Sequence, residues 1–198
     1  MDIFPRVRGI ILKPQIEWAK IKDEQITVDG LLKSYLLILA AIPSAAQFLG
    51  FWLIGASLPS GVHLRIGFGS SLARAVVSYV LSLASVFIAA LVIEALAPNF
   101  SSRPNRENAM KLVTYSMTPY FVAGVFFIFP GLTVLVIMAG IYGLYVLYLG
   151  FQNGLMETPK EKVMGYFILT LVVDIVLVLA MSLIVGVIFP LRHFYRGL

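Results

Sequence analysis

The chain has 198 residues, of which 60% are hydrophobic and 13% are charged, and its formal net charge is +5. A soluble domain of this length has about a quarter of its residues charged. The composition therefore excludes an ordinary soluble fold and indicates one integral membrane domain. Lys and Arg lie in loops beside apolar segments, without interleaved aromatic residues, so we expect no nucleic-acid partner.

The first 33 residues form a mixed rather than a continuously apolar segment. Apolar residues recur at helical spacing from Phe4 to Ile11, and Pro14 ends this piece because proline disfavours helix at the preceding residue. A second piece carries Trp18 and Ile21 among polar residues. Two interpretations remain open: both pieces lie in the membrane interface with Trp18 as an anchor, or they pack against the ends of the spans. No signal peptide is predicted, since an apolar core is missing here.

Five apolar segments are long enough to cross a bilayer, which takes about 20 helical residues. We predict an all-α membrane domain at 34–190, with spans at 34–57, 73–97, 110–129, 131–151 and 166–189 and a short outer tail at 191–198. Asp29 is predicted to cap the first span. Pro43 and Pro119 are predicted to kink the first and third spans, because proline removes a helical hydrogen bond.

The third and fourth spans are joined almost without a loop. Pro130-Gly131 stands between them and is typical of a turn. A continuous helix over both arms would cross the hydrocarbon core twice. The sequence therefore predicts an antiparallel hairpin that turns at Pro130.

Small and polar residues follow one side of the second span. They are Ser71, Arg74, Ser78, Ser82, Ser85 and Ala89. Close helix packing explains such a stripe, and so does a water-filled path. Glu94 lies on the other side near the predicted interface, where we expect it to be solvated or paired with a lysine.

Asp174 lies near the middle of the fifth span, and Thr170 shares its helix face. A charged residue at mid-membrane costs at least about 2.5–3.5 kcal/mol, so Asp174 must be neutralised, paired or hydrated. Structural hydrogen bonding and a polar pathway both remain open. Tyr142, Tyr145 and Tyr148 form a ladder on the fourth span that suits packing and interfacial anchoring, or a ligand site.

The sequence predicts no catalytic, cofactor-binding or metal-binding residues. Cysteine is absent, and the two histidines, His63 and His193, have no carboxylates near them in the sequence. No nucleophile is placed beside a base, and the spacing does not bring Glu94 and Asp174 together.

The distribution of Lys and Arg predicts the orientation. The N-terminal segment and the loops at 98–111 and 152–163 share one side and hold eleven of the fifteen Lys and Arg residues, and the other side holds four. Loops rich in these residues stay in the cytoplasm, so we predict a cytoplasmic N-terminus and an outer C-terminus.

Four segments resemble the Yip-one domain family, whose eukaryotic members bind Ypt/Rab GTPases. They are Lys13-Pro14 with Glu17-Trp18 and Ile21; Leu96-Ala97-Pro98-Asn99-Phe100; Tyr115-Ser116-Met117-Thr118-Pro119; and Tyr142-Gly143-Leu144-Tyr145 with Gly154-Leu155-Met156 and Pro159. The resemblance implies five spans and a cytoplasmic N-terminus. The long N-terminal region of eukaryotic members is missing, and Thr114 stands where they usually have glycine. The chain is similar to the short prokaryotic branch, which implies a bacterial or archaeal cytoplasmic membrane and does not imply a Rab partner.

Two functions follow as expectations. The first is a non-enzymatic scaffold or adaptor that contacts lipids and binds a protein partner or a second copy, with Trp18, Arg103 and Arg106 as candidate contacts. The second is an oligomeric channel, transporter or lipid-moving protein with a polar path along Asp174, Thr170 and Arg74. Tyr115 is a further candidate polar residue, for which a structural role is sufficient.

Overall fold

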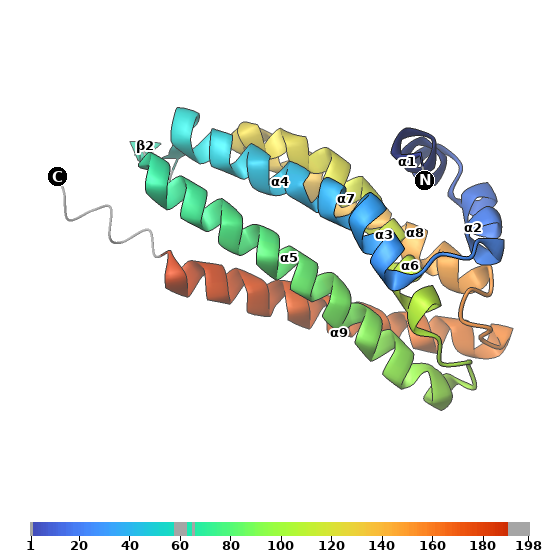
Figure 1. The fold of residues 1–198 in the computed structure, drawn as a ribbon. Helices are drawn as coiled ribbons and strands as arrows, with labels where there is room; N and C mark the ends of the chain where they lie inside the picture. The colour runs from blue at the N-terminus through green and yellow to red at the C-terminus, as the bar shows by residue number, and fades with distance from the viewer. Residues whose placement is uncertain (1, 58–62, 65, 190–198) are drawn as a thin grey trace.

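Five long helical segments run side by side, and two short helices lie across one end of the bundle (Figure 1). The structure, a computed structural model, describes residues 2–57, 63–64 and 66–189. By length and composition, five segments can cross a membrane: Val28–Ile54, Phe68–Phe100, Arg106–Ile128, Thr133–Gln152 and Lys160–Ile188. The prediction of an all-α fold with five spans is confirmed.

Two short helices precede the spans. They are α1 (Ile3–Leu12) and α2 (Pro14–Asp23), which meet at Lys13. Pro14 occupies the first position of α2, where its missing N–H costs nothing. In Figure 1, α1 is seen nearly end-on, whereas the spans run across the view. Both short helices therefore lie crosswise to the spans.

The first span begins earlier than predicted. It comprises α3 (Val28–Leu31), the π-helical turn η1 (Leu32–Leu36), α4 (Leu37–Leu49) and a second π-helical turn η2 (Gly50–Ile54). The prediction that Asp29 caps it is wrong. The Thr27 hydroxyl is the cap and accepts from the Gly30 N–H at 3.1 Å, whereas Asp29 lies inside the first turn and pairs with Lys33 at 2.9 Å. The predicted start at residue 34 rests on hydropathy, which marks only the part of the helix in the hydrocarbon core. The helix itself begins at Val28, before this apolar part.

The remaining helices complete the bundle. They are α5 (Phe68–Leu96) with the 3-10 turn η3 (Ala97–Phe100), α6 (Arg106–Ser116), α7 (Thr118–Ala123) with the 3-10 turns η4 (Gly124–Ile128) and η5 (Pro130–Leu132), α8 (Thr133–Gln152) and α9 (Lys160–Ile188). Two short antiparallel strands of two residues each, β1 (Ala56–Ser57) and β2 (His63–Leu64), lie between η2 and α5 along the chain.

The prolines act differently in the two spans that contain them. The third span is interrupted at Met117, directly before the Thr118-Pro119 start of α7. By contrast, α4 runs through Pro43 without interruption. Pro43 instead faces Gly124, where an added Cβ would lie 2.8 Å from the Pro43 Cα. Glycine therefore allows the first and third spans to touch at this point.

The hairpin turns at η5, and its arms pack closely. An added Cβ on Gly143 of α8 would lie 2.8 Å from the Ser116 carbonyl oxygen of α6. Such close approach through glycine is a common way to join helices in a membrane, where lipid is as apolar as the side chains.

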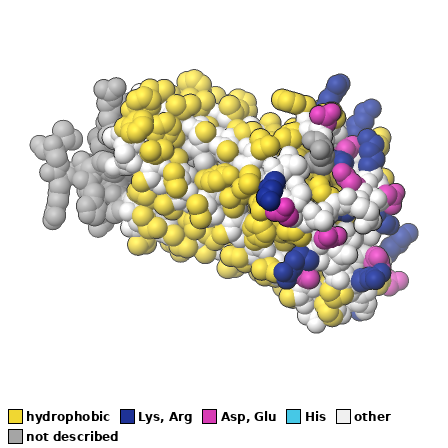
Figure 2. Space-filling model, viewed as in Figure 1, with side chains coloured by type: hydrophobic (Ala, Val, Ile, Leu, Met, Phe, Trp, Pro, Cys, Tyr) yellow, Lys and Arg dark blue, Asp and Glu magenta, His cyan; other side chains and the backbone are white. Residues whose placement is uncertain are grey.

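The surface divides into two zones (Figure 2). Hydrophobic side chains cover the long body of the bundle, and Lys, Arg, Asp and Glu gather at the end that carries α1 and α2, which we call the charged end. The helix α9 is the most exposed span, because no residue of its most apolar stretch is buried. The apolar zone is the surface that lipid would cover.

Candidate functional site: an N-terminal platform at the charged end

Residues of three of the four resemblance motifs, represented by Trp18, Tyr115 and Tyr142, converge on one place. We call α1, α2 and the connecting residues up to Glu24 the N-terminal platform (residues 3–24). Its inward side chains, Ile10, Trp18 and Ile21, are at most 1% exposed. Together they cover parts of α6, α7 and α8. Through this inward side the segment packs on the bundle, as in the second of the two interpretations made from sequence, but it contacts the sides of α7 and α8 as well as their ends.

Trp18 is the centre of this packing. Its indole Nε1–H donates to the Val146 carbonyl oxygen of α8 at 2.9 Å. The ring meets Tyr115 edge-on at 6.2 Å between centroids. An added Cβ on Gly150 would lie 2.9 Å from Trp18 Cζ2, so only glycine leaves room for the indole. Trp18 is therefore buried inside the protein, where it is exposed neither to lipid as an anchor nor to a partner as a contact.

Tyr115 joins the platform to the first span. Its ring lies edge-on to Tyr35 at 5.0 Å between centroids, and both side chains are fully buried. The Tyr35 hydroxyl shares a hydrogen bond of 2.8 Å with the Thr118 hydroxyl. A third aromatic side chain takes part through a hydrogen bond: the Tyr142 hydroxyl donates to the Ile11 carbonyl oxygen at 2.8 Å. Segments distant in the sequence are thus held by aromatic side chains.

An ionic network lies beside these rings. Arg6 Nη1 donates to Glu17 Oε1 at 2.7 Å, and Arg6 Nη2 donates to Glu24 Oε2 at 2.5 Å. The guanidinium carbon of Arg6 also lies 5.4 Å from the centre of the Tyr115 ring. The Arg6 and Glu17 side chains are 12% and 9% exposed, so this pair is largely withdrawn from water. Such a pair fixes the relative positions of α1 and α2 more than it adds stability.

Lys111 ties α2 to the third span. Only 3% of this residue is exposed. Its Nζ donates to the carbonyl oxygens of Ile21 at 3.3 Å and Glu24 at 2.5 Å. Both carbonyls belong to the C-terminal end of α2, where a cation is favoured by the helix dipole. Lys111, which the sequence pattern assigned to the loop at 98–111, is thus buried and caps the C-terminal end of α2.

The other motif segments form a second contact region at the charged end. Phe100 stacks on Tyr166 with 4.6 Å between ring centroids, and the Tyr166 hydroxyl donates to the Ile93 carbonyl oxygen. The Arg103 N–H donates to the Met156 carbonyl oxygen at 3.2 Å. These contacts fix the loop after η3 against the segment that connects α8 and α9.

The predicted polar residues of this region are paired and partly exposed. Glu94 Oε2 accepts from Arg106 Nε at 2.8 Å, so its partner is an arginine and not the expected lysine. The Arg103 guanidinium lies 4.0 Å from Glu157 and is 76% exposed. Arg103 and Arg106 are therefore available at the surface, unlike Trp18.

The polar residues inside the membrane do not form one site. Thr170 is 1% exposed, and its hydroxyl donates to the Tyr166 carbonyl oxygen of its own helix at 2.9 Å. Asp174 is half-buried and has no hydrogen-bond or ion-pair partner among the residues that the structure describes. The helices α5 and α9 run antiparallel and touch where Tyr166 contacts Ile93. Asp174 lies eight residues after Tyr166 and Ser85 lies eight residues before Ile93, so Asp174 and Ser85 lie at the same depth.

Arg74 lies elsewhere. It sits about three helical turns from the depth of Ser85, toward the far end of α5. Its guanidinium carbon lies 4.8 Å from the centre of the Phe51 ring, and within the described part of the chain its buried Nε has no acceptor. The Ser82 and Ser85 hydroxyls donate to carbonyls of their own helix. The geometry thus gives no continuous polar row from Arg74 to Asp174.

Within the described residues, no group of three or more His, Asp or Glu side chains is close enough to hold a metal ion. The side chain of His63 and all of His193 fall outside the described part of the chain. The predictions of no metal and no cofactor stay predictions.

Sequence reasoning missed Arg6, Lys111 and Tyr35 as members of the platform. Lys111 gave a signal, because it stands at the start of the predicted third span at 110–129. A lysine at such a place is often paired or snorkelling. Arg6 and Tyr35 gave none, since their partners lie far away in the sequence.

Comparison with known proteins places the chain in a family. The model of the Yip1 domain matches residues 8–182. Proteins named Inner membrane protein YohC from two strains of Escherichia coli are each 32% identical over 186 residues, covering 92% of this chain and 94% of the relative. No solved structure matches the chain. The family match begins within α1 and ends within α9, and it includes residues 8–24 of the platform. This chain belongs to the Yip1 domain family.

Proposed function

We propose that this protein is a non-enzymatic membrane scaffold or adaptor, which binds other proteins through its charged end, and that this end faces the cytoplasm. The observation that carries the proposal is the platform. Its motif residues, Trp18, Tyr115 and Tyr142, are used to join helices and not to line an open site. A surface held by such a framework is preorganised, which lowers the entropic cost of binding a partner.

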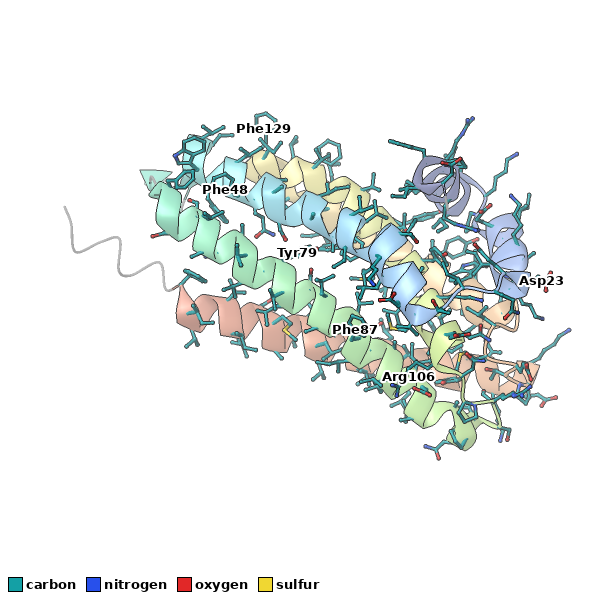
Figure 3. All side chains as sticks on the ribbon, viewed as in Figure 1. Asp23, Phe48, Tyr79, Phe87, Arg106 and Phe129 are labelled. Atoms are coloured by element: carbon teal, nitrogen blue, oxygen red, sulfur yellow. The ribbon has the colours of Figure 1, made fainter. Side chains whose placement is uncertain are left out.

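The surface offered to a partner is polar and mixed in charge. Arg103 and Glu157 are 76% and 59% exposed, and Arg106 is 60% exposed. Beside Arg106 lies a small pocket lined by Val28, Phe87, Leu91 and Met110. Figure 3 shows Phe87 and Arg106 near each other on neighbouring helices. An arginine next to an apolar pocket is a common element of protein interfaces.

Site-specific photo-crosslinking in native membranes tests the proposal. A photoreactive residue at Arg103 or at Glu157 should yield a discrete adduct with another protein. The same residue at Ser70, an exposed position at the far end of α5, serves as the control. No adduct from either charged-end position, with the protein well folded, would contradict an adaptor function.

The orientation is tested separately. The chain has no cysteine, so single cysteines at Arg103 and Ser70 have no background. A membrane-impermeant maleimide applied to intact cells should label Ser70→Cys and not Arg103→Cys. The reverse pattern would place the charged end outside, against the positive-inside rule.

Asp174 supports a second candidate function. A half-buried aspartate without a partner among the described residues is costly in a membrane and marks many ion and substrate pathways. An oligomeric channel, transporter or lipid-moving protein would use it. Flux of ions and fluorescent lipid into liposomes, compared between the wild type and Asp174→Asn, distinguishes the two functions. Flux that is lost in the variant would favour the transport function.

A further inference from the structure

The helix α1 has a second face that does not contact the bundle. Phe4, Arg8 and Leu12 follow one another at a spacing of four and share this outer face, opposite the buried Ile10. Phe4 is 88% exposed and Leu12 is 63% exposed. Ile16, at the start of α2, continues the apolar surface and is 57% exposed. We call Phe4, Arg8, Leu12, Lys13 and Ile16 the outer face of the platform.

The depth of α1 decides what this outer face meets. The Ile11 carbonyl oxygen accepts from Tyr142, which lies about 15 Å along α8 from the charged-side end of that helix at Gln152. The helix α1 also packs against α7, which belongs to the half of the third span farther from the charged end. It therefore lies beside the spans and not beyond their ends. A helix at this level, crosswise to the spans, runs parallel to the plane of the membrane (Figure 1).

The outer face lies at the same depth as lipid-facing side chains of the spans. The neighbouring α8 exposes Met138, Ile141 and Tyr145, which flank Tyr142 in the sequence, and all three are large apolar or amphipathic side chains. Lipid that covers these residues therefore reaches the level of Leu12. This shared depth favours lipid over a soluble protein as the occupant of the outer face.

Charge on the outer face points to the same occupant. Arg8 and Lys13 are exposed and have no ion-pair partner among the described residues, whereas Arg6 on the inner side is fully engaged. Free cations beside exposed apolar side chains are the pattern of helices that lie in the boundary between head groups and acyl chains. Anionic phosphate groups are the natural counter-ions there.

We propose that α1 is an in-plane membrane helix, with Phe4, Leu12 and Ile16 inserted at the boundary between head groups and acyl chains and with Arg8 and Lys13 bound to the phosphates of anionic lipids. The inference goes beyond the adaptor function and does not depend on it. The platform then has two sides, of which one is fixed to the protein and the other to the bilayer.

Depth-dependent quenching tests the apolar part. A fluorophore sensitive to polarity is attached to Leu12→Cys in the full-length protein in liposomes, with Phe4→Cys as a second site and exposed Asp23→Cys on α2 as the control. Quenchers on lipid acyl chains should quench the first two fluorophores, and aqueous iodide should quench only the third. Equal access of iodide to all three would overturn the proposal.

Lipid selectivity tests the cationic part. Liposomes of phosphatidylcholine, with and without phosphatidylglycerol, are compared for enrichment of the anionic lipid around the protein. Removing Arg8 and Lys13 together should lower this enrichment, by about fivefold per cation. The control is Lys33→Gln, because Lys33 is already paired with Asp29. An enrichment that does not change would overturn this part.

A protein occupant would give a different result. In that case the Leu12 fluorophore would be open to iodide in liposomes, and a photoreactive residue at Leu12 would yield a protein adduct in native membranes. That pair of results would overturn the lipid assignment and return the outer face to the adaptor function. The expected result is that the photoreactive residue at Leu12 crosslinks to lipid, both in liposomes and in native membranes.

Discussion

The two ends of the bundle are held together by different interactions. At the charged end, hydrogen bonds and ion pairs join segments far apart in the sequence, such as Trp18 with Val146 and Arg6 with Glu17. At the far end, contact depends on shape: Phe48 stacks on Trp52 at 5.7 Å between centroids, and Gly50 lies against the backbone at Phe127. Lipid supplies no hydrophobic driving force between helices, so a span without either kind of contact stays exposed.

The helix α9 is held by contacts with its neighbours in one half and is left exposed in the other. Its charged-end half buries Val163, Tyr166 and Thr170 against its neighbours, and from residue 171 onward its described residues are half-buried or exposed. The buried contacts of α9 are therefore concentrated at the charged end. Four variants test the difference between the two ends.

Trp18→Ala should have the largest effect. The substitution removes a fully buried indole and leaves the Val146 carbonyl oxygen without its donor, which should cost about 3–5 kcal/mol. Unfolding in mixed detergent micelles measures the free energy. The control is Trp52→Ala at the far end, where the ring is 39% exposed and a smaller loss is expected. Equal losses for both variants would remove the distinction between the two ends.

Arg6→Met should come second. Removing one partner from a largely buried ion pair leaves Glu17 and Glu24 without their counter-charge, and we expect a loss of about 2–3 kcal/mol. The double variant with Glu17→Gln should lose less than the sum of the single variants. By comparison, Asp29→Asn breaks an exposed i,i+4 pair and should cost only about 0.3–0.5 kcal/mol. A strictly additive double variant would show that Arg6 and Glu17 do not interact.

Gly50→Ala tests close packing at the far end. The added Cβ would lie 2.5 Å from the Phe127 carbonyl oxygen, so the backbones must move apart at a cost of about 1–3 kcal/mol. Gly186→Ala in α9 is the matched control, because nothing lies within 4 Å of its added Cβ. That variant should be neutral or slightly stabilising. Thermal unfolding that does not distinguish the two variants would contradict the contact.

Asp174→Leu should have the smallest effect, and the sign should be opposite. Replacing a half-buried aspartate that lacks a partner among the described residues removes a desolvation cost, so we expect a gain of about 1 kcal/mol. The same unfolding assay measures it. A loss of stability would reveal a partner for Asp174, such as a second copy of the chain.

The class of protein and the number of spans could be predicted from the sequence alone. Apolar runs of about 20 residues must form helices in lipid, because every backbone hydrogen bond has to be made within the segment. The turn at Pro130-Gly131 was predictable for the same reason, since only a hairpin fits two such runs. The limits of the helices were less predictable, as Thr27 in place of Asp29 shows, because a cap depends on local backbone angles.

The site was decided by tertiary structure. The sequence indicated that Trp18 and Tyr115 matter, but their burial depends on Gly150 and on the position of α2. In the sequence, Arg6 and Lys111 look like ordinary surface cations, and only the fold places Glu24 between them. Asp174, Thr170 and Arg74 suggested a common path, and the helix register puts Arg74 several turns away from the other two. The sequence determined which segments enter the membrane, since that depends on each segment alone; which polar groups meet depends on contacts between segments, and only the folded chain decides them.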